Sequence, residues 1–369
     1  MLKRLAVLFA VLALVAAACG GADEAEETTT TAAESEPPAQ ETPGDGTLET
    51  VMSRGTLKCG VSTSAPGFTD VNPDGSLSGF DVDFCHAIAA AVLGDGEAVE
   101  FRQLTAKERF AALESGEIDV LVRNTTWTQT RDTELPQDFV HTTFYDGQQI
   151  MGNPANLPGL TAGGGFADID GAVVCTNAGT TTEQNIKEGA ELAGVTIQLQ
   201  TVENFTEAMD GFIAGSCDIV TTDGSGLFGH RASNIAAGTA GAENWVIFPE
   251  APISKEPLGP VVRQGDSTWF DVVQWTVFST FALEEFGITS ANASSMAGEA
   301  GEVGRLLGGD GEKQTAMGLP ADAFLQVALQ VGNYGEIYER NLAPLKLSRD
   351  GTFNEQWFNG GLIYSPPFR

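Results

Sequence analysis

The chain has 369 residues, with 19 Lys or Arg and 50 Asp or Glu, and a formal net charge of −31 at pH 7. So acidic a protein is a poor ligand for nucleic acids, because their phosphates repel it. The charge favours solubility in a salty exterior, and the length exceeds one simple core, so two lobes or domains are expected.

The N-terminus has the parts of a secretory signal peptide. Lys3 and Arg4 supply a positive start, and residues 5–15 form an apolar run too short for a stable membrane span. We therefore assign residues 1–18 to a signal peptide. Cys19 follows three alanines, which resembles a bacterial lipobox, and in that interpretation Cys19 is lipidated and becomes the first mature residue. The alternative is ordinary cleavage, with the cysteine there by coincidence.

An acidic segment follows this cysteine. Residues 20–50 are rich in Glu, Thr, Ala and Pro and contain no Lys or Arg. Such a composition buries too little apolar surface to offset the entropy of ordering, and its charges repel one another. Residues 19–45 are therefore expected to be a disordered tether. It would hold the folded part at an extracytoplasmic membrane face through the several acyl chains of the lipid anchor.

Four further cysteines form an even set, which suggests disulfides in an exported protein. They are Cys59, Cys85, Cys175 and Cys217. Three pairings can be drawn, and we expect the two early cysteines to pair in one lobe and the two late ones in the other. Zinc is the rival interpretation, but the chain has no C-x-x-C and its histidines lie in unrelated contexts, at His86, His141 and His230. No metal or cofactor is predicted.

Regular elements begin near residue 56. Residues 56–61 predict a strand, and the sequence Asn-Pro-Asp-Gly at residues 72–75 predicts a turn. Apolar side chains then recur at helical spacing and predict an amphipathic helix, at Phe84, Ala87, Ile88, Ala91 and Val92.

A second strand and helix follow. The strand is predicted at residues 99–101, and Thr105 with Glu108 forms a T-x-x-E capping box that opens the helix. The buried face of this helix is predicted at Phe110 and Leu113. Gly116 ends it, and residues 118–122 are an apolar, branched run typical of a buried parallel strand.

The same plan recurs further along the chain. Short strands are predicted at residues 172–175, 195–199 and 218–222. Thr180 and Glu183 form another T-x-x-E box, and residues 205–213 repeat the helical spacing before Gly215. The repeat predicts an α/β protein of two βαβ lobes with helices on both faces of each sheet. A ligand of such a protein would lie in the cleft between the lobes, at strand C-terminal ends.

Polar side chains crowd the loop that follows the strand at residues 118–122. In this loop, Arg131 can clamp a carboxylate through two parallel hydrogen bonds, and Thr126 can add a third. The alternative is a solvated loop in which Thr126 only caps a helix.

Two more strand ends carry candidate binding groups. Gly179 lets the backbone approach a ligand, and the helix-start N–H groups with the hydroxyls of Thr180 and Thr181 form an anion site or serve only as a cap. Asp223 can pair with an ammonium group, or it can simply form an Asp-Gly turn. Two anion-receiving loops and one acid together predict a receptor for a zwitterion such as an α-amino acid.

Enzyme motifs are lacking. The chain has no G-x-S-x-G elbow and no P-loop. Cys85 and His86 are adjacent on one helix, so their side chains point apart and cannot act as a pair. We therefore predict binding without catalysis.

Six stretches carry a resemblance to a known family. They are residues 79–85, 104–110, 123–128, 179–183, 254–260 and 330–337. Through them the chain resembles the polar amino-acid-binding proteins of ABC transporters, and within these the general L-amino-acid-binding proteins of bacteria (family 3 extracellular solute-binding proteins). The resemblance covers about residues 48–369. It implies a periplasmic-binding-protein fold of type II, with lobe 1 at residues 46–149 plus 258–369, lobe 2 at residues 150–257, and two crossing strands as the hinge.

The resemblance also implies a mechanism and a site. A monomer would capture an L-amino acid, close its lobes and dock on the permease subunits of an ABC importer. Arg131 with Thr126 matches the carboxylate clamp of lobe 1, Thr181 beside Thr180 matches the carboxylate contact of lobe 2, Asp223 matches the ammonium partner, and Asn124 matches an assisting position.

One departure concerns the ligand's side chain. Many relatives place an aromatic residue in the first strand-helix loop to stack on the ligand. In this chain the loop, residues 62–68, has no Tyr next to Pro66, and Phe68 is the candidate for that place. Arg109 or Arg123 can bias the site toward acidic or amide side chains. Two alternatives stay open: an enzyme on the same fold, such as a prephenate- or arogenate-type dehydratase, and a ligand-binding sensor module.

Overall fold

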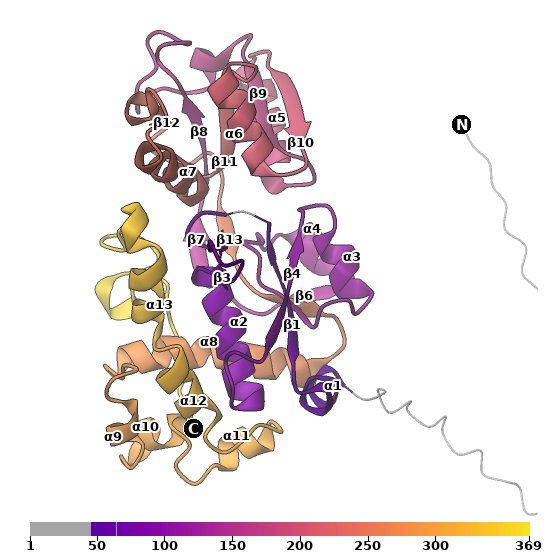
Figure 1. The fold of residues 1–369 in the computed structure, drawn as a ribbon, viewed down its shortest axis with the longest axis vertical. Helices are drawn as coiled ribbons and strands as arrows, with labels where there is room; N and C mark the ends of the chain where they lie inside the picture. Colours follow the sequence, from indigo (N-terminus) through magenta and orange to yellow (C-terminus); the bar gives the residue numbers. More distant parts are fainter. Residues whose placement is uncertain (1–45, 64) are drawn as a thin grey trace, which may run out of the picture. The chain divides into compact units, whose positions relative to one another are not determined.

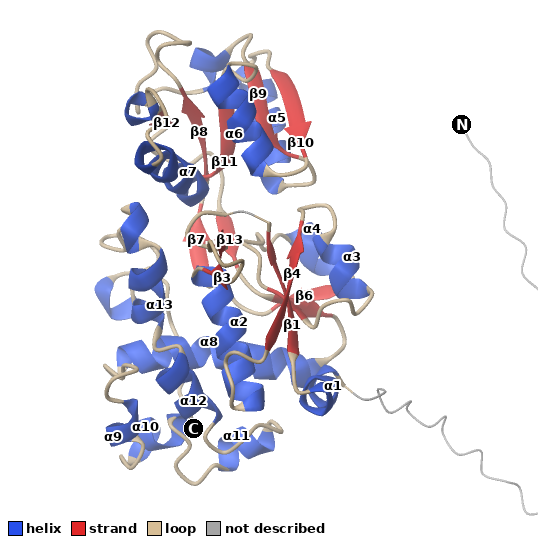
Figure 2. Ribbon diagram, viewed as in Figure 1, coloured by secondary structure: helices blue, strands red, loops and turns tan. Residues whose placement is uncertain are grey.

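The computed structural model describes residues 46–63 and 65–369 (Figure 1). The predicted signal peptide, the candidate lipidation site Cys19 and the tether lie outside the described residues. No helix in the described part is long and apolar enough to cross a membrane. Its strands form two five-stranded sheets and two two-stranded ones, with helices between them (Figure 2). The fold is a two-lobed α/β fold, as predicted.

Five strands make the first sheet: β1 (Leu57–Ser62), β4 (Val99–Leu104), β5 (Val120–Leu121), β6 (Gln137–Phe139) and β14 (Val261–Arg263). Their order is β4-β1-β5-β14-β6. β1 pairs in parallel with β4 and β5, as βαβ units require, whereas β14 runs antiparallel to β5 and β6. Because β14 comes late in the sequence, the chain leaves this lobe and returns to it.

Helices and a hairpin surround this sheet: α1 (Thr47–Arg54), α2 (Phe80–Leu93), α3 (Arg109–Glu114) and α4 (Gln129–Thr133), with β2 (Asp70–Val71) and β3 (Leu77–Ser78). The predicted turn joins β2 to β3, where Gly75 N donates to Asn72 O at 2.9 Å. Asp83, His86 and Leu93 are the residues of α2 that keep partial exposure. The prediction that α2 is amphipathic is therefore wrong, because later helices cover its second face.

The second sheet has the order β10-β9-β11-β8-β12. Its strands are β8 (Gln148–Gly152), β9 (Val173–Asn177), β10 (Gln198–Val202), β11 (Ile219–Asp223) and β12 (Val246–Phe248). β9, β10 and β11 are parallel, and β8 runs antiparallel to β11 and β12. The helices of this lobe are η1 (Phe166–Ile169), α5 (Thr181–Ala193), α6 (Phe205–Ala214), α7 (Gly224–Ala236) and η2 (Ala242–Asn244). Two separate apolar clusters fill the opposite faces of the sheet.

A two-stranded ribbon lies between the two sheets in the sequence and in space (Figure 1). It consists of β7 (Phe144–Asp146) and β13 (Glu256–Leu258), which pair antiparallel. The chain passes from β7 into β8 after one residue, and from β13 into β14 after two. These are the two crossing strands that the family resemblance implied.

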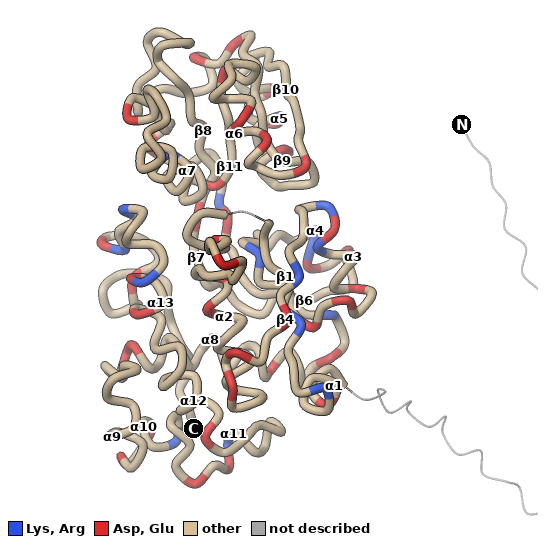
Figure 3. The backbone as a smooth tube through the Cα atoms, viewed as in Figure 1, with Lys and Arg blue, Asp and Glu red and all other residues tan. Residues whose placement is uncertain are grey.

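The C-terminal part is helical and packs on the first lobe. It contains α8 (Ser267–Glu285), α9 (Ala293–Met296), α10 (Gly301–Leu306), α11 (Glu312–Ala316), α12 (Ala323–Gln330), α13 (Tyr334–Asn341), η3 (Ala343–Leu345) and η4 (Trp357–Asn359). Helices α8 and α12 both contact α2, and their apolar side chains join its core cluster. Asp and Glu residues occur along the backbone of both lobes (Figure 3).

One disulfide cross-links each lobe internally. Cys59 in β1 pairs with Cys85 in α2, and Cys175 in β9 pairs with Cys217 just before β11, with Cα–Cα distances of 6.1 and 5.8 Å. The predicted pairing of early with early and late with late cysteines is confirmed. Within the described residues no group of His, Cys, Asp or Glu could hold a metal ion.

Element boundaries follow the local signals with some shifts. Glu108 N donates to Thr105 Oγ1 at 3.4 Å, and Thr105 N donates to Glu108 Oε2 at 3.0 Å, so the predicted box is present just before α3. The strand predicted at residues 195–199 lies three residues later, as β10. Residues 195–197, at the start of the predicted strand, form a loop instead, in which Thr196 O accepts Gly171 N at 2.6 Å.

Candidate functional site

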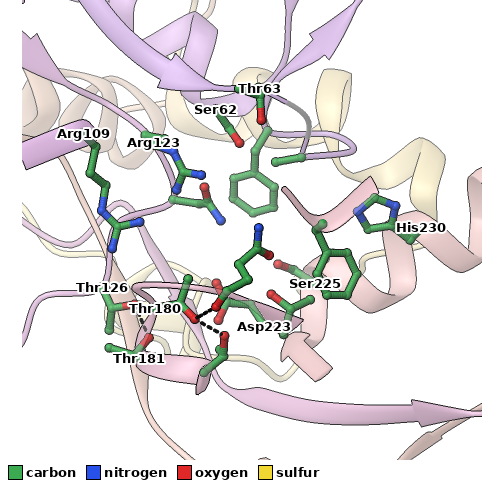
Figure 4. Close-up of a pocket in the computed structure, with 18 of the residues that line it drawn as sticks. Ser62, Thr63, Arg109, Arg123, Thr126, Thr180, Thr181, Asp223, Ser225 and His230 are labelled. Atoms are coloured by element: carbon green, nitrogen blue, oxygen red, sulfur yellow. Dashed lines mark hydrogen bonds between the residues drawn. The ribbon is translucent and has the colours of Figure 1, made fainter. Parts of the chain in front are cut away.

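A cleft lies where strand ends and helix starts of the two lobes meet (Figure 4). It encloses about 60 Å³, several times the space that one water molecule needs. All six residues predicted from the sequence line it: Asn124, Thr126, Arg131, Thr180, Thr181 and Asp223. The structure therefore brings the predicted set together from three separate strand ends.

Arg131 enters the cleft from the short helix α4. Thr128 caps this helix by accepting Arg131 N at 3.2 Å, and the Arg131 guanidinium donates to Thr126 O at 2.9 Å. Burial lowers the pKa of Arg131, although Glu256 and Asp223 raise it. Its position inside the protein leaves guanidinium N–H groups that can hold a carboxylate.

Thr126 is not the cap of α4, and its side chain is buried. The residue is 4% exposed, and Trp127 N donates to Pro257 O of β13 at 2.8 Å, which fixes the loop to the ribbon. Thr126 Oγ1 lies 3.3 Å from Thr181 Oγ1 of the other lobe (Figure 4). The two hydroxyls thus mark the point where the lobes meet beside the guanidinium.

Asn124 stands at the start of the same loop with a left-handed backbone, φ 30°. Its N–H donates to Asp81 Oδ2 at 2.7 Å, which secures the turn. Asn124 Oδ1 is buried and has no hydrogen-bond partner among the described residues. A buried acceptor without a partner costs free energy, so this oxygen is available to a ligand donor.

Thr180 and Thr181 differ although they are adjacent. The Thr180 hydroxyl accepts Glu183 N at 3.0 Å and donates to Asn177 O at 2.8 Å, so it caps α5. The Thr181 hydroxyl donates to Glu256 Oε2 at 2.9 Å, so its oxygen can still accept a hydrogen bond. Thr181 is the first residue of α5. Thr180 is therefore the cap of α5. The N–H groups in the first turn of α5 have no acceptor within the helix, so those that Thr180 does not accept are open to a ligand.

Asp223 closes the opposite side as the last residue of β11. It is 7% exposed, and its side chain does not cap α7. Burial raises the pKa of this carboxyl well above its ordinary value, and the nearby carboxyls of Asp146 and Glu256 raise it further, against Arg131 and Arg109. A ligand ammonium group would place a positive charge next to this carboxyl and so favour its ionised form.

Arg109 and Arg123 also line the cleft (Figure 4). Arg109 is 2% exposed, its guanidinium lies 4.7 Å from the Phe110 ring centre, and its Nε has no partner among the described residues. Burial and the charges of Arg131 and Arg123 hold the pKa of Arg109 well below its ordinary value. Arg123 is better compensated, because its Nε donates to Leu104 O at 2.9 Å and Asp81 lies nearby.

The other lining residues include one aromatic candidate from the sequence and three residues that had no sequence signal as ligand contacts. Phe68, the one aromatic candidate in the first loop, does line the cleft. Ser225, Phe205 and His230 come from the second lobe, and the His230 ring packs 5.0 Å from that of Phe205. Burial lowers the pKa of His230 to about 4, so it is neutral at physiological pH. Only the spatial approach of α6 and α7 to the cleft reveals these three.

Among the described lining residues, Asp223 supplies the one carboxyl group. Glu256 lies behind the cleft wall and accepts hydrogen bonds from Thr181, Asn185 and Ser254. A site with one acid, several arginines and hydroxyls is arranged to hold a small bipolar molecule.

Known proteins resemble this chain over most of its length. The sequence profile of the bacterial extracellular solute-binding proteins, family 3, matches residues 57–277. The glutamate/glutamine/aspartate/asparagine-binding protein BztA of Rhodobacter capsulatus is 44% identical over 326 residues, 88% of this chain and 93% of that protein. The general L-amino acid-binding periplasmic protein AapJ of Rhizobium johnstonii is 43% identical over 329 residues, with coverage of 88% and 93%.

A solved structure extends the similarity to the fold. An ABC transporter periplasmic binding protein from Brucella ovis with glutathione bound is 44% identical, with a TM-score of 0.82. The match covers 88% of this chain and 99% of that one. The chain therefore belongs to the bacterial extracellular solute-binding proteins, family 3.

Proposed function

We propose that this protein binds an L-amino acid with an acidic or amide side chain and delivers it to the permease subunits of an ABC importer. The observation that carries the proposal is the opposition of Arg131 and Thr126 to Asp223 across one cleft. Two relatives that match nearly the whole folded part are named as amino-acid-binding proteins, and one name specifies glutamate, glutamine, aspartate and asparagine.

The main chain of the ligand would lie between these groups. Its α-carboxylate would accept from the Arg131 guanidinium, the Thr126 hydroxyl and the first-turn N–H groups of α5, beside Thr181. Its ammonium group would donate to Asp223, with the unpaired Asn124 Oδ1 as a further acceptor. Every polar group of the zwitterion would then have a partner, as a buried ligand requires. Thr180 would act through the cap of α5.

The ligand's side chain would reach Arg109. A guanidinium only donates hydrogen bonds, so the group that meets it must be an acceptor. A carboxylate would also relieve the repulsion among Arg109, Arg123 and Arg131, and an amide oxygen would satisfy the donors without the charge. The site should therefore favour glutamate and aspartate first, their amides next, and aliphatic amino acids last.

The remaining parts of the chain would serve delivery. Residues 1–18 would direct export, a lipid on Cys19 would anchor the protein, and residues 19–45 would tether it near its permease. Lobe 1 would comprise residues 46–149 plus 258–369 and lobe 2 residues 150–257, closing as a monomer about β7 and β13. Closure would be the signal read by the permease subunits.

Catalysis is not part of the proposal. A dehydratase on this fold would need a catalytic acid in the cleft besides Asp223, and the described lining residues offer no second carboxyl group. Release of unchanged ligand after binding, followed by chromatography, separates reversible capture from turnover.

Calorimetric titration of the purified protein with the common amino acids tests the proposal. We expect heat with L-glutamate and L-aspartate, and no heat with any amino acid would overturn it. Arg109→Met keeps the aliphatic stem against Phe110 and removes the charge. It should weaken L-glutamate binding at least about tenfold and leave L-alanine binding unchanged. Arg102→Met, at an exposed arginine of β4, is the matched control. An equal loss for both amino acids would contradict a side-chain role for Arg109.

A further inference from the structure

The C-terminal segment after α13, residues 342–356, touches three parts of the molecule. It lies beyond residue 277, where the family profile ends. It packs on the helices of the first lobe, on strand β7 of the ribbon, and on α7 of the second lobe. We call residues 342–356 the brace.

Arg349 fixes the brace to the first lobe. Its guanidinium makes two bonds to the Glu284 carboxylate of α8, at 2.6 and 3.2 Å, and lies 4.9 Å from the Tyr334 ring centre. Its Nε donates to Asn354 O at 3.0 Å. Because Arg349 is 8% exposed, this bidentate pair is a firm anchor for the residues on either side.

Asn354 fixes the brace to the hinge ribbon. Its Oδ1 accepts Tyr145 N at 2.7 Å, and its Nδ2 donates to Tyr145 O at 3.0 Å. Tyr145 stands opposite Pro257 in the β7–β13 pair. Because a proline has no N–H, these two residues form no ladder hydrogen bonds, and the N–H and C=O of Tyr145 face the outer edge of β7. The side-chain amide of Asn354 thus satisfies the backbone N–H and C=O of Tyr145 at the outer edge of β7, as a neighbouring strand would.

Leu345 reaches the second lobe. Helix α7 contacts η3, and a Cβ built on Gly229 of α7 would lie 3.4 Å from Leu345 Cδ1 and 3.0 Å from Pro66 Cβ. Glycine is a poor residue for the interior of a helix, so its presence at this point in α7 matches the close approach. Two first-lobe residues, Leu345 and Pro66, therefore pack directly on the second lobe.

We infer that the brace is a third connection between the lobes, which positions β7 through Asn354 and favours the closed conformation through Leu345 on Gly229. This inference rests on the proposed function for its ligand. Contacts that join the lobes are lost when the lobes separate, so they raise the closed population. The apparent affinity for a ligand that needs closure rises with that population. Leu345 and Asn354 act as positioning residues, since neither lines the cleft.

The first test concerns Leu345. Leu345→Ala should raise the Kd for L-glutamate about three- to tenfold, because it removes a contact that would be lost when the lobes separate. Gly229→Val should raise it further, since its side chain would meet Pro66. Leu329→Ala on the surface of α12 is the matched control. Spin labels at Glu114→Cys and Glu191→Cys report the lobe separation, which should lengthen in Leu345→Ala even without ligand.

The second test concerns Asn354. Asn354→Ala should speed hydrogen exchange of the Tyr145 amide at least about tenfold, whereas Asn359→Ala on the exposed turn nearby should not change it. Unchanged lobe separation in Leu345→Ala, or unchanged exchange in Asn354→Ala, would overturn the brace. Absence of amino-acid binding by the unaltered protein would instead overturn the proposed function. The separation and exchange measurements would still decide the brace.

Discussion

Among the described lining residues, the first lobe supplies the arginines of the cleft and the second lobe supplies its carboxyl group, whereas both lobes contribute hydroxyl groups. Arg109, Arg123 and Arg131 all lie around β5, and Thr181 and Asp223 lie at the ends of β9 and β11. Both lobes nevertheless use the same βαβ plan. The fold places binding groups at strand ends, and the residues found there decide which end of a bipolar ligand each lobe would receive.

Burial acts in opposite directions on the charged groups Arg131 and Asp223, which the two lobes present to the cleft. Burial lowers the pKa of Arg131 in the first lobe and raises that of Asp223 in the second, the directions expected when a charged form loses solvent. A zwitterion between them would offer each lobe the opposite charge. Ligand binding and closure should therefore be coupled, because the ligand completes contacts that neither lobe makes alone.

The largest effect is expected in the first lobe, at Arg131. Arg131→Ala removes the proposed carboxylate clamp and should weaken L-glutamate binding by about 3 kcal/mol, roughly a hundredfold in Kd. Arg131→Lys should recover only part of the loss, because an ammonium group cannot make two parallel bonds. Calorimetry measures both variants, with Arg102→Ala as the exposed control. Unchanged affinity in Arg131→Ala would remove Arg131 from the site.

The counterpart in the second lobe, Asp223, should have a smaller effect. Asp223→Asn keeps the shape and one acceptor oxygen, so we expect a loss of about 2 kcal/mol, roughly thirtyfold in Kd. The same change removes a buried carboxyl, so the ligand-free variant should melt at a higher temperature. Asp210→Asn on the exposed face of α6 is the control for both measurements.

Asp223 should also make the affinity depend on pH. Burial raises the pKa of the ligand-free carboxyl, so at any pH below that pKa the ligand's ammonium must displace a proton from Asp223. Kd should therefore rise about tenfold per unit as the pH falls below that pKa, and binding should release protons. Titrations in buffers of different ionisation enthalpy measure the release. Equal profiles for the unaltered protein and Asp223→Asn would exclude this carboxyl as the titrating group.

Much of this contrast could be predicted from the sequence, because it depends on local chemistry. Arg131, Thr181 and Asp223 each follow an apolar strand, and parallel strands end at one edge of a sheet, so their convergence needs only the βαβ plan. The disulfides followed for the same reason, since each joins neighbouring elements of one lobe.

Features that depend on distant packing could not be predicted. Helix α2 carries an apolar stripe in sequence, but α8 and α12, far along the chain, bury its other face. Arg109 follows a capping box and was considered only as a bias on side-chain preference. Its position in the cleft depends on how α3 packs beside β5. Likewise, nothing near Asn354 in the sequence indicates its bonds to Tyr145, 209 residues away.

The smallest and most discriminating test compares Thr180 with Thr181. Thr180→Val removes the cap of α5 and should lower the free energy of unfolding by about 1 kcal/mol, with little change in affinity. Thr181→Val should instead weaken L-glutamate binding by about 1 kcal/mol, roughly fivefold, because its hydroxyl meets Thr126 where the lobes join. Thermal unfolding and calorimetry on both variants separate the two roles. If both variants lost stability and neither lost affinity, the second lobe would hold the ligand's carboxylate through backbone N–H groups only. The difference between the lobes in binding side chains would then be limited to the arginines of the first lobe and Asp223 of the second.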